Sequence, residues 1–168
     1  MRHLIERVLE LAEEEEGPSL RPTSVEEMDS NDEELKRLLE SLQPRIRVYG
    51  VGGAGCNAVS RLHEEGLFDS RYVIGHSINT DAQALLMSPL ENKVLIGRTA
   101  RGRGAGGDPT KGENAALESE ANLRKITDDT QLAIITAGMG GGSGTGAAGQ
   151  IARLAKAQGA LTVAVVTY

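Results

Sequence analysis

Seven glycines fall between Gly138 and Gly149, a density that few folded segments accept. Glycine costs the most backbone entropy to order and brings no side chain to pack, so such a cluster needs a reason, such as a close approach of backbone to a bound group. Residues 50–57 (GVGGAGCN) and 102–109 (GRGAGGDP) share this character. We call residues 50–57, 102–109 and 138–146 the first, second and third glycine loops.

From residue 45 onward, short apolar runs typical of strands alternate with segments of helical periodicity. Strands separated by helices imply right-handed crossovers and a parallel sheet with helices on both faces, so the expected fold class is α/β. Ligands of such sheets bind in the loops beyond the carboxyl ends of the strands, where the glycine loops fall. We expect strands over residues 46–51, 72–78, 93–96, 132–137 and 161–168, and helices over residues 54–65, 81–87, 111–125 and 147–158.

The first 44 residues differ in charge from the rest. They carry thirteen Asp and Glu against five Lys and Arg, a balance of −8, whereas residues 45–168 carry eleven against thirteen, a balance of +2. Leucine-rich periodicity predicts a helix over residues 4–12 and another after a capping box at residues 30–33, with a flexible linker over residues 17–29. We therefore expect an acidic helical and flexible extension over residues 1–44 and a globular domain from residue 45.

Composition argues against several classes of protein. No apolar run is long enough to cross a bilayer, so we expect no membrane insertion, and without a signal peptide the cytoplasm is the expected location. A nearly neutral domain with one Phe and three Tyr is poorly suited to nucleic acid. One Cys and three His, without metal-ligand spacing, do not predict a structural zinc site.

Glycine loops that open helices are suited to binding phosphates. Without Cβ atoms their N–H groups can converge on an anion, and the helix that follows adds the positive end of its dipole. No window has the Walker pattern G-x-x-x-x-G-K-[ST]. The first loop fits a dinucleotide fingerprint, with Asp81 as the ribose acid, so an NAD-type oxidoreductase domain stays open as the alternative, although it leaves the other two loops unexplained.

Four motifs in this order resemble the tubulin/FtsZ family, and within it the FtsZ branch of cell-division GTPases. They are GGAGCN at residues 52–57, NTD at 79–81, GAGGDP at 104–109 and GGGSGTG at 140–146. Two positions depart from the family pattern: Ser143 stands where Thr is usual, and Gln150 where Pro is usual. Ser143 keeps a hydroxyl, and the loss of Pro removes a preset φ without removing the anion site.

The resemblance implies a role for each motif. Asn79 and Asp81 would lie near the phosphates and a bound Mg²⁺, although Asp81 could equally be a helix cap. No chemical role is assigned to the Cys56 side chain, and the roles of Arg101 and Arg103 stay open. The α- and β-phosphates would be held by Gly52, Gly53, Ala54, Gly55, Cys56 and Asn57 of the first glycine loop. The γ-phosphate would be sensed by Ala105, Gly106 and Gly107 of the second loop. The β-phosphate would be wrapped by Gly140, Gly141, Gly142, Ser143, Gly144, Thr145 and Gly146 of the third loop.

The resemblance also implies what the whole protein does. It would bind GTP and GDP with Mg²⁺, assemble head to tail with copies of itself, and act with other division proteins at the division ring in the cytoplasm. The catalytic acid of this family comes from a later loop of the neighbouring subunit, so no catalytic residue is assigned within residues 1–168. We expect residues 45–168 to be the N-terminal part of the GTP-binding domain, to bind nucleotide weakly and to show no steady-state turnover alone.

Overall fold

The computed structural model describes residues 31–70 and 72–168, and the chain divides into two units, Met1–Leu42 and Gln43–Tyr168. The described part of the first unit is α2, Asn31–Leu42, whose leucines at positions 35, 38, 39 and 42 are all exposed. This confirms the second expected helix. The helix expected over residues 4–12 and the linker over residues 17–29 lie outside the described residues. No helix within the described ranges combines the length and apolar content needed to cross a bilayer.

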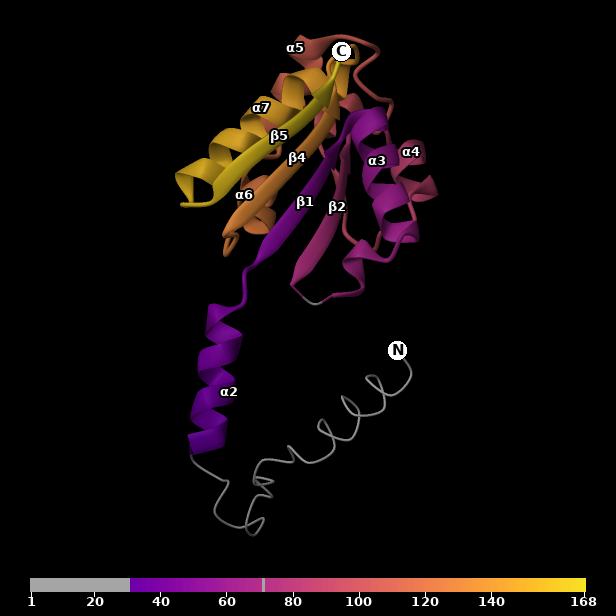
Figure 1. The fold of residues 1–168 in the computed structure, drawn as a ribbon. Helices are drawn as coiled ribbons and strands as arrows, with labels where there is room; N and C mark the ends of the chain where they lie inside the picture. The colour runs from indigo at the N-terminus through magenta and orange to yellow at the C-terminus, as the bar shows by residue number, and fades with distance from the viewer. Residues whose placement is uncertain (1–30, 71) are drawn as a thin grey trace, which may run out of the picture. The chain divides into compact units, whose positions relative to one another are not determined.

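The second unit is built on a five-stranded parallel sheet (Figure 1) with the strand order β3-β2-β1-β4-β5. This confirms the expected α/β class. At the carboxyl end of β1, Val51 pairs with Ile78 of β2 and with Ala137 of β4, so three strands end at the same level. The strands are β1, Ile46–Val51; β2, Val73–Asn79; β3, Lys93–Leu95; β4, Leu132–Gly138; and β5, Leu161–Thr167.

Helices cover both faces of the sheet (Figure 1). Tyr49, Val51 and Ile135 belong to the larger buried cluster, together with apolar residues of α5, α6 and α7. Val48 belongs to a smaller cluster with Val59 of α3. The helices are α3, Gly52–Glu64; α4, Ala82–Met87; α5, Pro109–Glu118; α6, Glu120–Thr127; and α7, Gly142–Ala157, with short 3₁₀ turns at Leu67–Asp69 and Arg98–Ala100.

The helix boundaries differ from the sequence expectation in two ways. The first and third glycine loops are largely the first turns of α3 and α7, which begin at Gly52 and Gly142 rather than near residues 54 and 147. The single helix expected over residues 111–125 is wrong, because the chain breaks into α5 and α6 at Ser119. The hydroxyl of Ser119 accepts the N–H of Gly97 at 2.9 Å, which ties the break to the turn that follows β3.

Candidate functional site

The glycine loops and the 79–81 segment meet at the carboxyl edge of the sheet. The first and third loops follow the neighbouring strands β1 and β4. The second loop pairs with the segment after β2, where the Ala82 N–H donates to the Gly102 carbonyl at 3.0 Å and the Gly104 N–H donates to the Thr80 carbonyl at 3.1 Å. The structure therefore brings all four sequence motifs together.

Several glycines of these loops are required for packing. A Cβ atom on Gly52 would lie 2.6 Å from the Gly144 nitrogen, and one on Gly142 would lie 2.8 Å from the Asp108 nitrogen and carbonyl oxygen. Cβ atoms on Gly55 and Gly146 would collide with the carbonyl oxygens of Thr136 and Pro109. Contacts this short are prohibitive for a real side chain. These glycines let backbone meet backbone, between the loops at Gly52, Gly142 and Gly146 and against β4 at Gly55.

Other glycines of the same loops face open space. A Cβ atom on Gly53, Gly140 or Gly141 would meet no atom within 4 Å, and none of the three has a positive φ. Gly106 and Gly107 are equally open but have φ values of 60° and 78°, which favour glycine for conformational reasons. No contact among residues 31–70 and 72–168 explains the absence of a side chain at Gly53, Gly140 and Gly141. We call the open surface over Gly53, Gly140 and Gly141, which Cβ atoms would fill, the glycine cradle.

The four helices that begin at this edge are capped differently. The Asp81 and Asp108 side chains accept backbone N–H bonds at the starts of α4 and α5. At α3 and α7 the N-cap residues, Val51 and Gly141, make no side-chain cap bond. The first-turn N–H groups of a helix have no partner within the helix itself. The donors and the positive dipole ends of two touching helices, α3 and α7, are therefore available to an anion.

The 79–81 segment uses its polar side chains to fix its own backbone. The Asn79 Oδ1 accepts the N–H groups of Thr80 and Asp81 at 2.8 and 3.2 Å, and Asn79 is buried. Asp81 Oδ1 accepts from Gln83 and Ala84 at 2.9 and 3.2 Å. Of the two roles left open for Asp81, the structure shows the helix cap. Asn79 thus fixes the backbone of the segment through its Oδ1.

Two members of the first motif point their side chains away from the glycine cradle. Cys56 is buried, and its thiol lies 3.5 Å from the carbonyl oxygens of Gly50 in β1 and Ile78 in β2, between α3 and the sheet. Burial raises the pKa of the Cys56 thiol. Asn57 is exposed beside Ser60 and Arg61 on the outer side of α3. If Cys56 contributes to the site, it does so through its backbone N–H.

The third motif contains a hydroxyl without a partner. Thr145 Oγ1 is buried and makes no hydrogen bond within the described part of the chain. A buried hydroxyl without a partner costs free energy, and such groups call for an explanation such as a bound water or ion. Ser143, in contrast, is engaged: its Oγ lies 2.6 Å from Thr80 Oγ1. Thr145, rather than Ser143, holds the unused hydrogen-bonding capacity in this loop.

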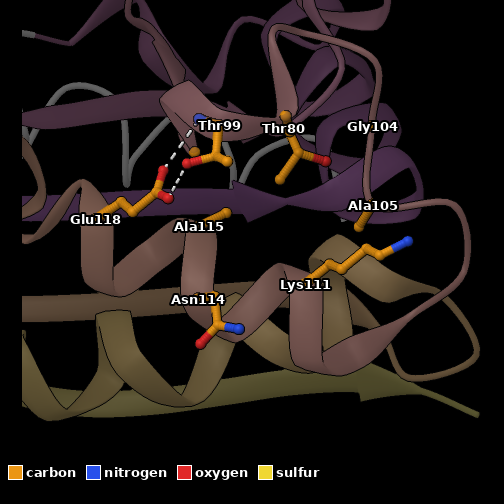
Figure 2. Close-up of a pocket in the computed structure, with 10 residues that line it drawn as sticks. Thr80, Thr99, Gly104, Ala105, Lys111, Asn114, Ala115 and Glu118 are labelled. Atoms are coloured by element: carbon orange, nitrogen blue, oxygen red, sulfur yellow. Dashed lines mark hydrogen bonds between the residues drawn. The ribbon is translucent and has the colours of Figure 1, made fainter.

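A hollow of about 400 Å³ adjoins the second glycine loop (Figure 2). Thr80, Gly104 and Ala105 line it together with residues of α5, and no residue of the first or third loop takes part. Figure 2 shows Lys111 reaching from α5 toward the second loop, while Thr99 donates its hydroxyl and N–H to Glu118. These hydrogen bonds hold the pKa of the exposed Glu118 carboxyl below its usual value. The cradle of open glycines and this hollow are separate features.

Sequence reasoning missed Thr80 and Lys111. Thr80 stood inside the NTD motif, but only burial and a hydrogen bond to a residue 63 positions away reveal its place. Lys111 begins the helix expected over residues 111–125 but received no role from the sequence. A signal was present, because a cation in the first turn of a helix opposes the helix dipole and calls for an anion nearby.

Acidic side chains do not form a preformed metal cage. Within residues 31–70 and 72–168, no three His, Cys, Asp or Glu side chains are placed to hold a metal ion. Mg²⁺ at phosphate sites commonly uses one or two carboxylates together with phosphate oxygens and water, so a cage is not required. Asp81 lies beside the second loop, since a Cβ atom on Gly104 would be 3.9 Å from its Oδ2. That oxygen is compatible with a phosphate-bound cation.

Comparison with known proteins identifies the family. Residues 45–168 match the Tubulin/FtsZ family, GTPase domain. Cell division protein FtsZ 1 of Pyrococcus abyssi is 47% identical over 169 residues, which cover 99% of this chain and 44% of that protein. The corresponding Methanocaldococcus jannaschii protein is 44% identical over 154 residues, 91% of this chain and 42% of that protein. The chain thus spans less than half the length of these relatives.

Solved structures agree with the sequence match. An empty FtsZ dimer of M. jannaschii superposes with a TM-score of 0.72 at 45% identity, covering 80% of this chain and 39% of that one. A GTPγS-bound protofilament of CetZ2 from Haloferax volcanii gives a TM-score of 0.64 at 27% identity, covering 73% and 39%. These matches give no support to the NAD-type oxidoreductase alternative. The chain belongs to the Tubulin/FtsZ family, whose GTPase domain it matches over residues 45–168.

Proposed function

We propose that residues 45–168 bind the phosphates of GTP and GDP on the first turns of α3 and α7. The observation that carries this proposal is the contact of two helix starts that lack side-chain caps, with Gly52 of one against Gly144 of the other. Two helix dipoles and a set of unpaired N–H groups then face the same anion. The open surface at Gly53, Gly140 and Gly141 gives phosphate oxygens room to approach the backbone.

The second glycine loop is suited to the γ-phosphate. Gly106 and Gly107 are exposed and hold positive φ values, the conformation in which successive N–H groups form an anion-binding concavity. The loop touches the third loop through Ala105, whose Cβ lies 2.8 Å from the position of a Cβ on Gly142. Mg²⁺ would be held by the phosphates and the Asp81 carboxylate, where it would neutralise phosphate charge.

The whole protein, by this proposal, hydrolyses GTP while assembling head to tail with copies of itself. Relatives of this chain are named as cell division proteins, and solved relatives include a dimer and a GTPγS-bound protofilament. A cytoplasmic division ring and contacts with other division proteins complete the proposal. Residues 45–168 would supply the nucleotide-binding half of a site shared between subunits, and the acid that positions water would come from the neighbouring subunit.

Alanine substitutions at open glycines test the nucleotide site. Gly53→Ala and Gly141→Ala place a methyl group where the protein has nothing to displace, at backbone angles that Ala accepts. We expect both variants to keep the thermal unfolding midpoint and to weaken GTP and GDP binding about tenfold or more, since a methyl group blocks the approach to the N–H groups. Titration followed by amide NMR measures weak as well as tight binding.

Gly149→Ala is the matched control. Gly149 lies on α7, is exposed, and also has no atom within 4 Å of a built Cβ, but it is two turns beyond the helix start. We expect this variant to bind nucleotide as the unchanged chain does and to be slightly more stable, because Ala favours a helix interior over Gly by about 1 kcal/mol. Unchanged affinity in Gly53→Ala and Gly141→Ala would refute the proposed site.

A further inference from the structure

Thr80 is hydrogen-bonded to two of the glycine loops. It follows β2 and is completely buried. Its Oγ1 lies 2.6 Å from the Ser143 Oγ in the third loop, and its carbonyl oxygen accepts the Gly104 N–H of the second loop at 3.1 Å. The Asn79 side chain accepts the Thr80 N–H at 2.8 Å and fixes the orientation of the residue. One residue therefore joins the proposed β-phosphate loop to the proposed γ-phosphate loop.

We propose that Thr80 is a positioning residue that couples the third glycine loop to the second. The inference rests on the proposed function, because coupling matters only if both loops contact one nucleotide. Thr80 is 0% exposed, although it borders the hollow beside the second loop. Its hydroxyl orients Ser143, the second residue of α7, while its backbone holds the start of the second loop.

The coupling has a direct consequence for recognition of the third phosphate. A diphosphate seated on α3 and α7 leaves the second loop without a ligand, whereas a triphosphate contacts both loops. Breaking the Thr80–Ser143 bond removes the side-chain link between the loops and leaves the backbone packing of Gly142 against Asp108. The N–H groups of the second loop are then held less firmly, and ordering them on binding costs free energy. The preference for GTP over GDP therefore falls when the bond is lost, by about the five- to tenfold that one hydrogen bond supplies.

The protein contains a second buried hydroxyl pair, whose members lie on β2 and directly after α4 rather than in the second or third glycine loop. Ser77 and Ser88 are both buried, and their hydroxyl oxygens lie 2.8 Å apart. Ser77 lies on β2, the strand that Thr80 follows. Removing this bond tests whether loss of any buried hydroxyl pair near β2 is sufficient to weaken nucleotide binding.

The experiment is a double-mutant cycle on nucleotide affinity. Thr80→Val, Ser143→Ala and the double variant are titrated with GTP and with GDP, and binding is followed by amide NMR. Thr80→Val removes the hydroxyl but keeps the side-chain shape and the carbonyl that binds Gly104. We expect Thr80→Val to weaken GTP five- to tenfold and GDP less, and Ser143→Ala to cost a smaller factor in the Thr80→Val background than alone. Thr80→Ser restores the hydroxyl and is expected to restore affinity to within about twofold.

The outcomes separate this inference from the proposed function. Absence of GTP-dependent shifts in the unchanged chain overturns the proposed function and the role of Thr80 with it. If the unchanged chain binds clearly, two results overturn only the role of Thr80. One is an equal effect of Ser143→Ala in both backgrounds, and the other is equal weakening of GTP and GDP binding by Thr80→Val. Ser77→Ala should lower the urea midpoint without changing the affinity for GTP or GDP. If Ser77→Ala weakened GTP binding as much as Thr80→Val does, the role of Thr80 would also be overturned.

Discussion

Gly52 and Gly144 meet backbone to backbone, and a Cβ atom on Gly52 would lie 2.6 Å from the Gly144 nitrogen and 3.0 Å from its Cα. The contact joins the first turn of α3 to the first turn of α7, two helices that follow the neighbouring strands β1 and β4. Because the two helix starts touch, their dipoles act on one place at the edge of the sheet. A site for a polyphosphate depends on this contact.

Substitution of Gly52 by Ala should destabilise the fold. The residue has φ 73°, which costs an L-residue about 1–2 kcal/mol, and the collision with Gly144 adds about 1–3 kcal/mol for overpacking. We expect Gly52→Ala to lower the free energy of unfolding in urea by about 2–5 kcal/mol. Gly53→Ala, at the next position with open space, should leave it nearly unchanged. Equal stability of the two variants would show that the helix starts do not meet as described.

The difference between packed and open glycines limits which glycine substitutions can test nucleotide binding. Replacing Gly142 and Gly144 by Ala would distinguish a GTP site from a dinucleotide site if both residues faced the ligand. A Cβ on Gly142 instead meets Asp108, and one on Gly144 lies 2.7 Å from the Gly138 carbonyl oxygen. Loss of binding in those variants would follow from a damaged fold.

The sequence predicts the parallel sheet, the order of its elements and the meeting of the motifs, because alternating patterns and glycine loops are local signals. It does not distinguish glycines that pack from glycines that face open space, since Gly52 and Gly53 are adjacent and only the structure shows that they differ in φ and in what surrounds them. Nor does it predict the break at Ser119, whose hydroxyl bonds to Gly97 over 22 positions. Long-range contacts of this kind decide the roles of Thr80 and Cys56 as well.

Cys56 offers a test of backbone against side-chain contribution in the first motif. Its thiol is buried between α3 and the sheet, and burial raises its pKa, so the reactive thiolate is scarce. We expect a thiol reagent such as DTNB to react slowly with the folded chain and rapidly in urea. Cys56→Ala should lower stability by about 1 kcal/mol and leave nucleotide affinity unchanged. A large loss of affinity without a change in stability would place the Cys56 side chain in the site.

His76 should make the fold sensitive to acid. The ring is 6% exposed, stacks on Tyr49 with centroids 5.3 Å apart, and has no hydrogen bond to either nitrogen among the described residues. Burial, assisted by the positive charge of Arg47, lowers the pKa of His76 from 6.5 to about 4. Above pH 6.5 both folded and unfolded chains are neutral at this position. As the pH falls from 6.5 to about 4 only the unfolded chain takes up the proton, so stability is lost through this window, by about 3 kcal/mol in total.

Urea unfolding at half-unit steps of pH measures this loss, and His76→Phe is its control. Phe can keep the aromatic stack on Tyr49 but does not titrate. We expect the stability of His76→Phe to change little between pH 6.5 and pH 5, where carboxylates of ordinary pKa are still largely ionised. A slope in that window as steep as that of the unchanged chain would assign the effect to another group.

Lys111 should favour a triphosphate over a diphosphate. It is exposed in the first turn of α5, lines the hollow beside Gly104 and Ala105, and forms no ion pair within residues 31–70 and 72–168. The dipole of α5 disfavours a cation at this position, and a γ-phosphate on the second loop would offset that cost. We expect Lys111→Gln to weaken GTP binding about fivefold and GDP binding less, since an exposed charge pair contributes about 1 kcal/mol. Lys156→Gln, in the last turn of α7, removes the same charge far along the helix from its start and should leave the ratio of the two dissociation constants unchanged. If Lys111→Gln lowered both affinities by the same factor, the lysine would act only through the overall charge of the domain.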